Sequence, residues 1–230
     1  SQACLMMDAD PAVRVLVLAG RGRHFSAGAD LNWMRRAGAA SEADNLSDAR
    51  RFARMLRSLS GLSKPTIARV QGAALGGGTG LAAACDMAVA SSDAVFSTSE
   101  VRFGIIPAVI SPYVLRAIGP RHALRYFQTG EKISAERALM IGLVSDVTPV
   151  DALDAGVAAL IEPLLAGAPS AQAASKELIE PIKGRLIDDA IMEETARRIA
   201  RQRATAEGRD GVAAFLDKRP PAWLVDQPGT

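Results

Sequence analysis

The sequence predicts an α/β fold with a mostly parallel sheet. Over the first half of the chain, short apolar runs typical of strands alternate with longer segments of helical periodicity, at the spacing of β-α-β units. The 230 residues are 49% hydrophobic and 23% charged, so one domain can bury a full core and still carry a helical extension. Past about residue 150 the pattern is helical almost throughout.

The elements of the first half follow from this alternation. Arg14–Gly20 (RVLVLAG) is a continuous apolar run, which is typical of a buried strand. Asp30 is placed to begin a helix, because its carboxylate can accept hydrogen bonds from first-turn N–H groups. Strands are expected at 13–19, 66–71, 86–91 and 94–97, and helices at 1–9, 30–38, 44–59 and 78–84.

The second half is predicted to be mostly helical. Helices are expected at 112–118, 121–128 and 135–141, followed by a brief strand at 144–147. From Val150 onward the helical pattern continues, and Pro163, Pro169 and Pro181 interrupt it. We therefore divide the chain into a core at 1–149 and a C-terminal helical region at 150–230.

A run of three glycines, Gly76, Gly77 and Gly78, separates the strand-like run Thr66–Val70 from the alanine-rich run Leu81–Cys85. A strand that turns through glycine into a helix leaves first-turn N–H groups unpaired, with the positive end of the helix dipole behind them. Glycine also lets a substrate carbonyl approach the backbone closely. A tight turn in a packed core is the alternative; a nucleotide-phosphate loop is disfavoured, because the spacing lacks G-x-x-x-x-G-K-[ST].

A second turn of the same kind comes earlier in the chain. After the strand-like run at 14–20, the segment Ser26–Asp30 (SAGAD) again reads as a small-residue turn that opens a helix. Each turn can offer one backbone donor, and two donors that converge on one oxygen form an oxyanion hole. The carboxylate of Glu100 follows the glycine run by a strand and a turn, where it can move a proton beside that oxygen.

An ordered set of motifs resembles the enoyl-CoA hydratase/isomerase, or crotonase, superfamily. The motifs are FSAGAD, KPTIARVQGAALGGG, a Glu before FGIIP, AIG, TGEKISAERALMIGLVSDV and EGRDGVAAFLDKRPPAW, which together cover about residues 13–224. An ordered set is much more specific than any one motif. The resemblance implies a crotonase-like β-β-α spiral core and a C-terminal helical region that forms trimers.

The resemblance also implies roles for particular residues. The two oxyanion donors fall on the backbone N–H groups of Ala29 and Gly77, and the acid/base carboxylate falls on Glu100. The coenzyme A moiety is expected to be gripped by the backbone around Ala27–Leu31, and the acyl group to lie near the glycine turn. The further substrate-binding residues are accordingly Ala27, Gly28, Asp30, Leu31, Gly76 and Gly80.

Position 80 departs from the best-known hydratases of the family, which carry a second Glu where this chain has Gly80. Two carboxylates can share the handling of a water molecule, whereas one must do all of it. Isomerases that shift a double bond can use one carboxylate, at the position of Glu100. The segment 99–119 (SEVRFGIIPAVISPYVLRAIG) nevertheless most resembles the corresponding sequence of bacterial hydratases of methylglutaconyl-CoA and related branched enoyl-CoA substrates.

We therefore expect a hydratase of a branched or glutaconyl-type enoyl-CoA, of the kind used in fatty-acid or branched-chain degradation. Gly80 is expected to leave room for a branched acyl chain or an ordered water. Isomerase is the second choice; a crotonase-type hydrolase or lyase stays open, and a non-catalytic CoA-binding homologue ranks last because Glu100 is present. Arg102 is expected to form a surface or structural ion pair; contact with a second carboxylate on the substrate is the less favoured alternative.

Composition limits the partners. The net charge of +2 gives no electrostatic case for nucleic acid, and the uncharged window at 72–85 is shorter than the ~20 residues that span a bilayer. Arginines cluster at 35–36, 50–57 and 197–203, which we interpret as solvated helix faces rather than phosphate-binding sites. His24 and His122 lack metal-ligand companions, so no metal is expected, and no cofactor beyond the coenzyme A of the substrate.

Cys4 and Cys85 are too far apart in sequence for a close-spaced metal pair and fit a reduced, cytoplasmic protein. The expected assembly is a homotrimer or a dimer of trimers, without a membrane or nucleic-acid partner. Family members usually carry a β-hairpin before the first helix, whereas this sequence begins inside that helix at Ser1. Either such a hairpin precedes Ser1 in a longer chain, which we expect, or the protein dispenses with it.

Overall fold

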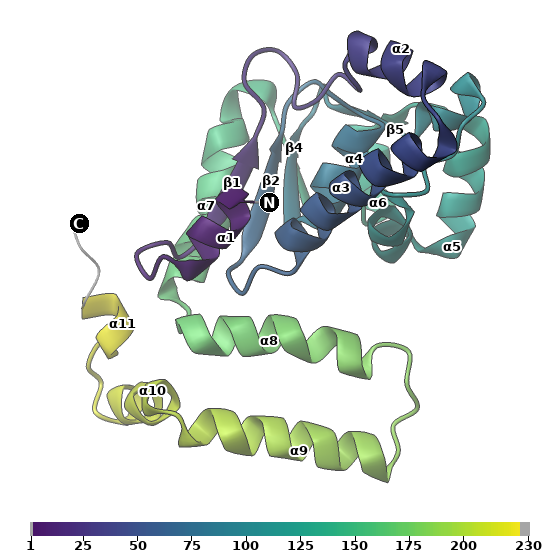
Figure 1. The fold of residues 1–230 in the computed structure, drawn as a ribbon. Helices are drawn as coiled ribbons and strands as arrows, with labels where there is room; N and C mark the ends of the chain where they lie inside the picture. The colour runs from purple at the N-terminus through teal and green to yellow at the C-terminus, as the bar shows by residue number, and fades with distance from the viewer. Residues whose placement is uncertain (1, 226–230) are drawn as a thin grey trace. The chain divides into compact units, whose positions relative to one another are not determined.

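The computed structural model describes residues 2–225 (Figure 1). The chain forms two compact units, one made by residues up to 62 together with 66–160, the other by 63–65 together with the residues from 161 onward. The first unit contains both sheets, and the second contains helices. No helix within 2–225 is long and apolar enough to cross a membrane.

The larger sheet is parallel and has the strand order β1-β2-β4-β7. Its strands are β1 (Leu16–Ala19), β2 (Thr66–Val70), β4 (Met87–Ser91) and β7 (Asp146–Thr148). The central strands β2 and β4 are almost fully buried, which explains their continuous apolar sequences. The predicted α/β class with a mostly parallel sheet is confirmed.

A smaller sheet has the order β3-β5-β6 and lies where the chain turns toward the glycine run. Its strands are β3 (Ala73–Leu75), β5 (Val95–Ser97) and β6 (Ile133–Ser134), with β3 parallel to β5 and β5 antiparallel to β6. Neither β3 nor β6 is expected from the sequence, because two or three residues are too few to show an alternating pattern.

The helices of the first unit begin where the sequence offers caps. The side chains of Asp30 and Ser41 accept hydrogen bonds from the first turns of the helices that follow them. One long helix is kinked at Gly119 (φ 72°) before Pro120, so the two helices expected at 112–118 and 121–128 are its two halves. The helical elements are α1 (Gln2–Ala9), α2 (Leu31–Ala39), α3 (Glu42–Ser60), α4 (Gly77–Ala84), η1 (Ser99–Phe103), α5 (Ser111–Thr129), α6 (Ala135–Met140), η2 (Val150–Ala152) and α7 (Leu153–Ala166).

The core of the first unit lies around α4. This helix packs against α3 and α5, and its small residues allow a close approach. The largest fully buried side chains nearby include Phe96, Leu56 and Ile133. A helix made almost entirely of glycine and alanine is stabilised by this burial rather than by its own propensity, because glycine disfavours helix.

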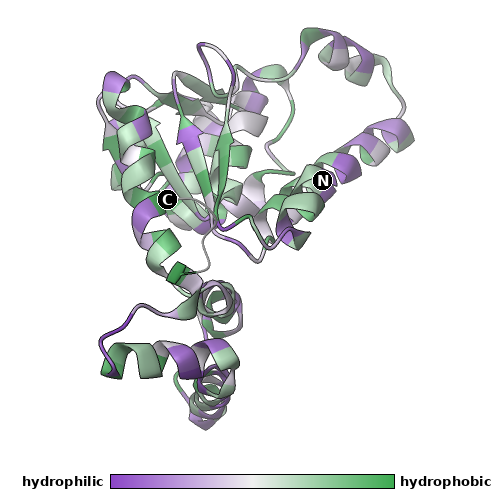
Figure 2. Ribbon diagram, turned by 90° about the vertical axis from the view of Figure 1, so that its left-hand side faces the viewer, coloured by the Kyte–Doolittle hydropathy of each residue, from purple (hydrophilic) through white to green (hydrophobic). Residues whose placement is uncertain are grey.

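The second unit contains the end of α7 from residue 161 onward, α8 (Pro169–Ile182), α9 (Asp189–Ala204), α10 (Ala206–Leu216) and α11 (Ala222–Val225). Glu207 joins α10 to the start of α8: its carboxylate accepts hydrogen bonds from the N–H groups of Ser170 and Ala171 and from the Ser170 hydroxyl. The large apolar side chains of the second unit are partly exposed, and Figure 2 colours the hydrophobic residues along its ribbon green. They include Ile187, Ile199, Val212, Phe215 and Leu216.

Candidate active site

The two turns predicted to supply backbone donors are joined by backbone hydrogen bonds. Ser26 pairs with Ala74 of β3 in a parallel bridge: the Ser26 N–H donates to Ala73 O at 2.9 Å, and the Leu75 N–H donates to Ser26 O at 2.9 Å. Ala29 lies three residues beyond Ser26, and Gly77 lies three residues beyond Ala74. Because the paired segments are parallel, both predicted donors lie beyond the same end of the bridge.

Glycine is required where these two segments meet. A Cβ at position 78 would lie 2.6 Å from the Ser26 Cβ, so any other residue would push the turns apart. Gly76 has φ 54° and Gly28 has φ 114°, both in the region that L side chains rarely adopt. The Gly76 N–H donates to Ser97 O at 2.8 Å, which ties the turn to β5.

The first turn of α4 presents its N–H groups outward. Gly76 precedes the helix and offers no side chain to cap it. Within the described residues, the N–H groups of Gly77 and Ala29 have no hydrogen-bond acceptor. Gly77 is half-buried and Ala29 exposed, as are the neighbouring residues predicted to bind coenzyme A (Ala27, Gly28, Asp30 and Leu31). Both N–H groups are therefore open to an oxygen of a ligand.

Thr79 supports this turn and was not predicted from the sequence. Its hydroxyl is buried and lies 2.7 Å from Ala74 O and 3.0 Å from Ser97 O. The hydroxyl thus joins α4 to the middle of β3 and to the end of β5, the two strands that lead to the glycine turn and to Glu100. A polar residue within a run of glycine and alanine is the sequence signal that could have identified it.

Glu100 lies beside the glycine turn. It belongs to η1, and its Oε1 is 3.3 Å from the point that a Cβ on Gly76 would occupy. Its Oε2 is buried and has no hydrogen-bond partner among the described residues. Burial raises the pKa of Glu100 above its ordinary value of 4.5. A half-buried carboxyl with a raised pKa and one unpartnered oxygen suits a group that exchanges protons.

Asp30 has a structural task at the mouth of the site. Its Oδ1 accepts a hydrogen bond from the Trp33 N–H at 2.8 Å, which caps α2. The Trp33 ring N–H in turn donates to Asp48 of α3 at 2.9 Å. These contacts fix the start of α2 and therefore the backbone of the exposed segment Ala27–Leu31.

The room expected at Gly80 is occupied by the protein itself, so this expectation is wrong. A Cβ at position 80 would lie 2.2 Å from the Cγ2 of Ile110 and 2.6 Å from its Cβ. Both residues are buried. The sequence could not reveal this, because Ile110 is 30 positions away and reaches α4 only through the packing of α5.

Arg102 lies on η1, two residues after Glu100. Its side chain packs over Gly130, with Nε 3.2 Å from the point that a Cβ there would occupy. The pKa of Glu131 is lowered mainly by its hydrogen bonds from Arg125, and the charge of Arg102 contributes. The two predictions for Arg102, a structural ion pair and contact with a substrate carboxylate, both stay predictions.

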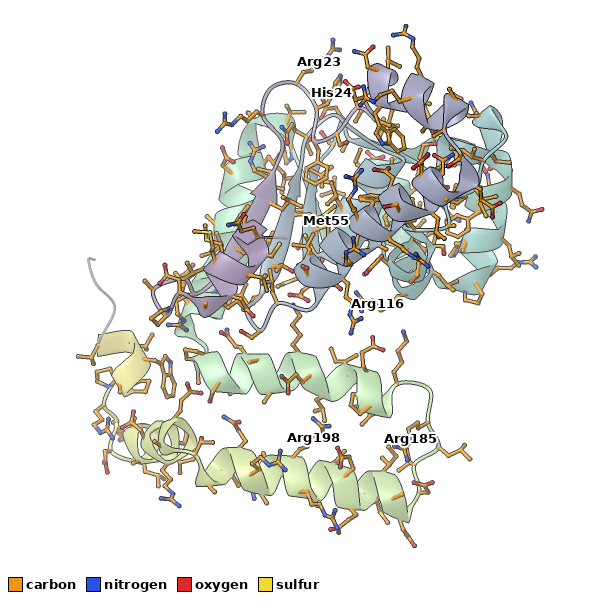
Figure 3. The ribbon with its side chains drawn as sticks, in the orientation of Figure 1. Arg23, His24, Met55, Arg116, Arg185 and Arg198 are labelled. Carbon is orange, nitrogen blue, oxygen red and sulfur yellow. The ribbon has the colours of Figure 1, made fainter. Side chains whose placement is uncertain are left out.

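The histidines have packing roles, as expected. His24 lies with Arg23 on the loop after β1 (Figure 3), and its Nδ1 accepts a hydrogen bond from the Ala73 N–H at 3.0 Å. His122 lies 3.4 Å from Arg137.

Several arginines of the clusters pair with acids one turn away on the same helix, as in Arg51–Asp48, Arg197–Glu193 and Arg198–Glu194. The interpretation of these clusters as solvated helix faces is supported.

Comparisons with known proteins show the family and the fold of the chain. The profile of the enoyl-CoA hydratase/isomerase family matches residues 1–226. The chain is 35% identical to 2,3-dehydroadipyl-CoA hydratase of Escherichia coli, over 92% of this chain and 81% of that protein. It is also 35% identical to crotonyl-CoA hydratase of Syntrophomonas wolfei, over 91% of this chain and 80% of that protein. Among solved structures, an enoyl-CoA hydratase from Shewanella pealeana superimposes with a TM-score of 0.93 at 42% identity, covering 96% of this chain and 83% of that one.

Proposed function

The chain belongs to the enoyl-CoA hydratase/isomerase family, and from this premise we propose that it adds water across the 2,3 double bond of an enoyl-CoA thioester. The observation that carries the proposal is the position of the Glu100 carboxyl beside the glycine turn, 3.3 Å from the Cβ point of Gly76. Acid/base chemistry and oxyanion stabilisation are both available there.

The reaction follows from the two donors and the one carboxylate. The thioester carbonyl oxygen accepts hydrogen bonds from the N–H groups of Ala29 and Gly77, which stabilise the negative charge of the enolate. The carboxylate of Glu100 takes a proton from water as the water oxygen bonds to the β-carbon. The carboxyl group then returns a proton to the α-carbon, so that one H and one OH are added in all.

Substrate binding is assigned to the exposed backbone at Ala27–Leu31, which would hold the coenzyme A moiety. Close to Glu100, the side chains of Phe103, Ile105 and Ile106 are exposed and apolar, which suits the hydrocarbon part of an acyl group. The resemblance of the sequence at 99–119 to branched enoyl-CoA hydratases supports a branched or glutaconyl-type acyl group. Free space at Gly80 does not support it, because Ile110 fills that volume.

Product analysis tests the proposal. Straight, branched and dicarboxylic enoyl-CoA thioesters are incubated with the protein, and loss of the conjugated enone absorbance and product mass are followed. We expect the mass of one added water, with the fastest turnover for a branched or glutaconyl-type substrate. If no thioester of the panel gains water, the hydratase proposal is wrong.

Double-bond isomerase is the second candidate, and a specific observation favours it: among the described residues, Glu100 is the carboxylate found within 4 Å of the Cβ point of Gly76, and a double-bond shift can proceed with one. In that case 3-enoyl thioesters become 2-enoyl thioesters of unchanged mass, and the α-carbon exchanges protons with solvent without any 3-hydroxyacyl product. The same mass measurement separates the two reactions.

We further expect a homotrimer or a dimer of trimers. The second unit exposes several large apolar side chains, with Phe215 83% and Leu216 71% exposed. An apolar groove of about 740 Å³ also runs along α5 and is lined by residues such as Val101, Leu115 and Phe127. Exposed apolar surface of this kind is typical of subunit contacts. Light scattering over a wide concentration range checks this expectation, and a monomer throughout would contradict it.

A further inference from the structure

The contact between Gly80 and Ile110 bears directly on the acid/base chemistry. A Cβ on Gly80 would come within 2.2 Å of Ile110 Cγ2, a distance that non-bonded carbon atoms essentially never adopt. Ile110 is 2% exposed and precedes α5, where its carbonyl accepts hydrogen bonds from the N–H groups of Tyr113 and Val114 at 3.1 Å. Its side chain is therefore held against α4 from a fixed backbone.

The direction of helical side chains shows what Ile110 displaces. A side chain on an α-helix points back toward the helix N-terminus and covers the preceding turn. The Gly80 N–H donates to Gly76 O at 3.2 Å, so position 80 lies one turn after Gly76. A side chain at 80 would consequently project toward Gly76 and the Glu100 carboxyl beside it, and Ile110 occupies the start of that path.

We propose that Ile110 is a positioning residue of the acid/base site: packed on Gly80, it closes the α4 side of Glu100 to water and to a second acid/base group, so that Glu100 alone transfers the proton. This inference rests on the proposed function only in requiring that Glu100 exchange a proton during turnover. It adds a residue that sequence reasoning assigned to no role, and it explains how a family member works with glycine at position 80.

The charged groups around Glu100 do not compete with this role. The raised pKa of Glu100 is caused by burial, without a contribution from any described charged side chain. Neither α4 nor the strands β3 and β5 carry a titratable residue. On η1, the side chain of Arg102 packs over Gly130. The charged side chains of α5 have other neighbours: Arg116 lies over the Tyr113 ring, and Arg125 binds Glu131. On the same helix, His122 lies near Arg137 and Arg121 is exposed. On α3, which reaches Gly77 through Phe52, Asp48 pairs with Arg51.

The test compares Ile110→Ala with Ile118→Ala. Both isoleucines are buried at or in α5, but Ile118 lies eight positions further along. The acid limb of the kcat/KM profile against pH is measured for wild type and both variants. We expect Ile110→Ala to move this limb to lower pH by about one unit, because water admitted beside Glu100 removes part of the desolvation. The Ile118→Ala profile should coincide with wild type although its stability falls. An unmoved limb in Ile110→Ala would overturn the proposal.

Two further measurements keep the inference testable whatever the variants do. If Ile110→Ala does not fold, Ile110→Leu, which keeps the volume but has no Cγ2 branch to pack on Gly80, should give the same shift in smaller size, and its absence counts against the proposal equally. In thermal unfolding, Gly80→Ala should lower Tm in the wild-type background and lower it less in the Ile110→Ala or Ile110→Leu background, because both variants lack the Cγ2 that meets a Cβ at position 80; equal losses would overturn the proposed contact. The pH profile can be recorded on hydration or on a double-bond shift, so a wrong choice of reaction does not affect this test.

Discussion

Replacing Glu100 by Gln is expected to lower kcat by about 10² to 10⁴ while the fold is retained. The change keeps the shape of the side chain but removes the group that accepts the proton of water. Its Oε2 has no hydrogen-bond partner among the described residues, so the new amide breaks no existing contact at that atom. Turnover of the best thioester of the panel measures the effect, and a folded Glu100→Gln protein with near wild-type turnover would refute the assignment.

The stability of the same variant supplies its control. Burial raises the pKa of Glu100, so the folded protein holds the proton more tightly than the unfolded chain does. Glu100 therefore contributes stability below its ordinary pKa, and that contribution is lost as pH rises through the raised value. We expect Glu100→Gln to be at least as stable as wild type at pH 8, with any advantage shrinking at acid pH. Denaturant unfolding at both pH values tests this, and a loss of stability at pH 8 would contradict it.

Replacing Gly77 by Pro should lower kcat by about 10² to 10³, with a smaller effect on the affinity for coenzyme A. Proline deletes the N–H that donates to the oxyanion. Gly77 is the first residue of α4, a position where proline is compatible with a helix because the N–H has no intrahelical partner. Saturation kinetics with the preferred thioester, together with binding of free coenzyme A, separate the two effects.

Gly77→Ala is the matched control for this substitution. It keeps the N–H but adds a Cβ that would lie 3.1 Å from the Cζ of Phe52, so it reports the cost of crowding against α3. We expect Gly77→Ala to retain most of the activity that Gly77→Pro loses. Equal activities of the two folded variants would mean that the Gly77 N–H does not act on the substrate.

The sequence predicted the parts of this molecule that depend on local pattern. The apolar runs at 66–71 and 86–91 correspond to β2 and β4, and Asp30, predicted to begin a helix, caps α2. The glycine turn and Glu100 lie side by side in the structure, as an oxyanion site with one carboxylate requires. Their catalytic roles remain predictions until the variants above are measured.

The sequence could not predict what depends on contacts between distant segments. The strand β3 is only three residues long, and it acquires strand character from its pairing with β5 and with Ser26. The Thr79 hydroxyl forms hydrogen bonds with buried carbonyl oxygens of two other segments. Ile110 packs on Gly80, which lies 30 positions earlier in the chain. Gly80 alone suggested free space, because a missing side chain in the sequence gives no sign of the neighbour that fills its volume.

The position of each proposed donor depends on the number of residues between it and the bridge formed by Ser26 and Ala74. Both proposed donors are main-chain groups, each three positions past the bridge, so side-chain changes at position 29 leave the N–H in place. Insertion or deletion of a single residue between 26 and 29 would instead move that N–H by about 3.3 Å, more than the length of a hydrogen bond. Engineered variants should therefore tolerate substitution at this turn far better than indels, and homologues are best compared by the spacing of these loops rather than by the identity of their residues.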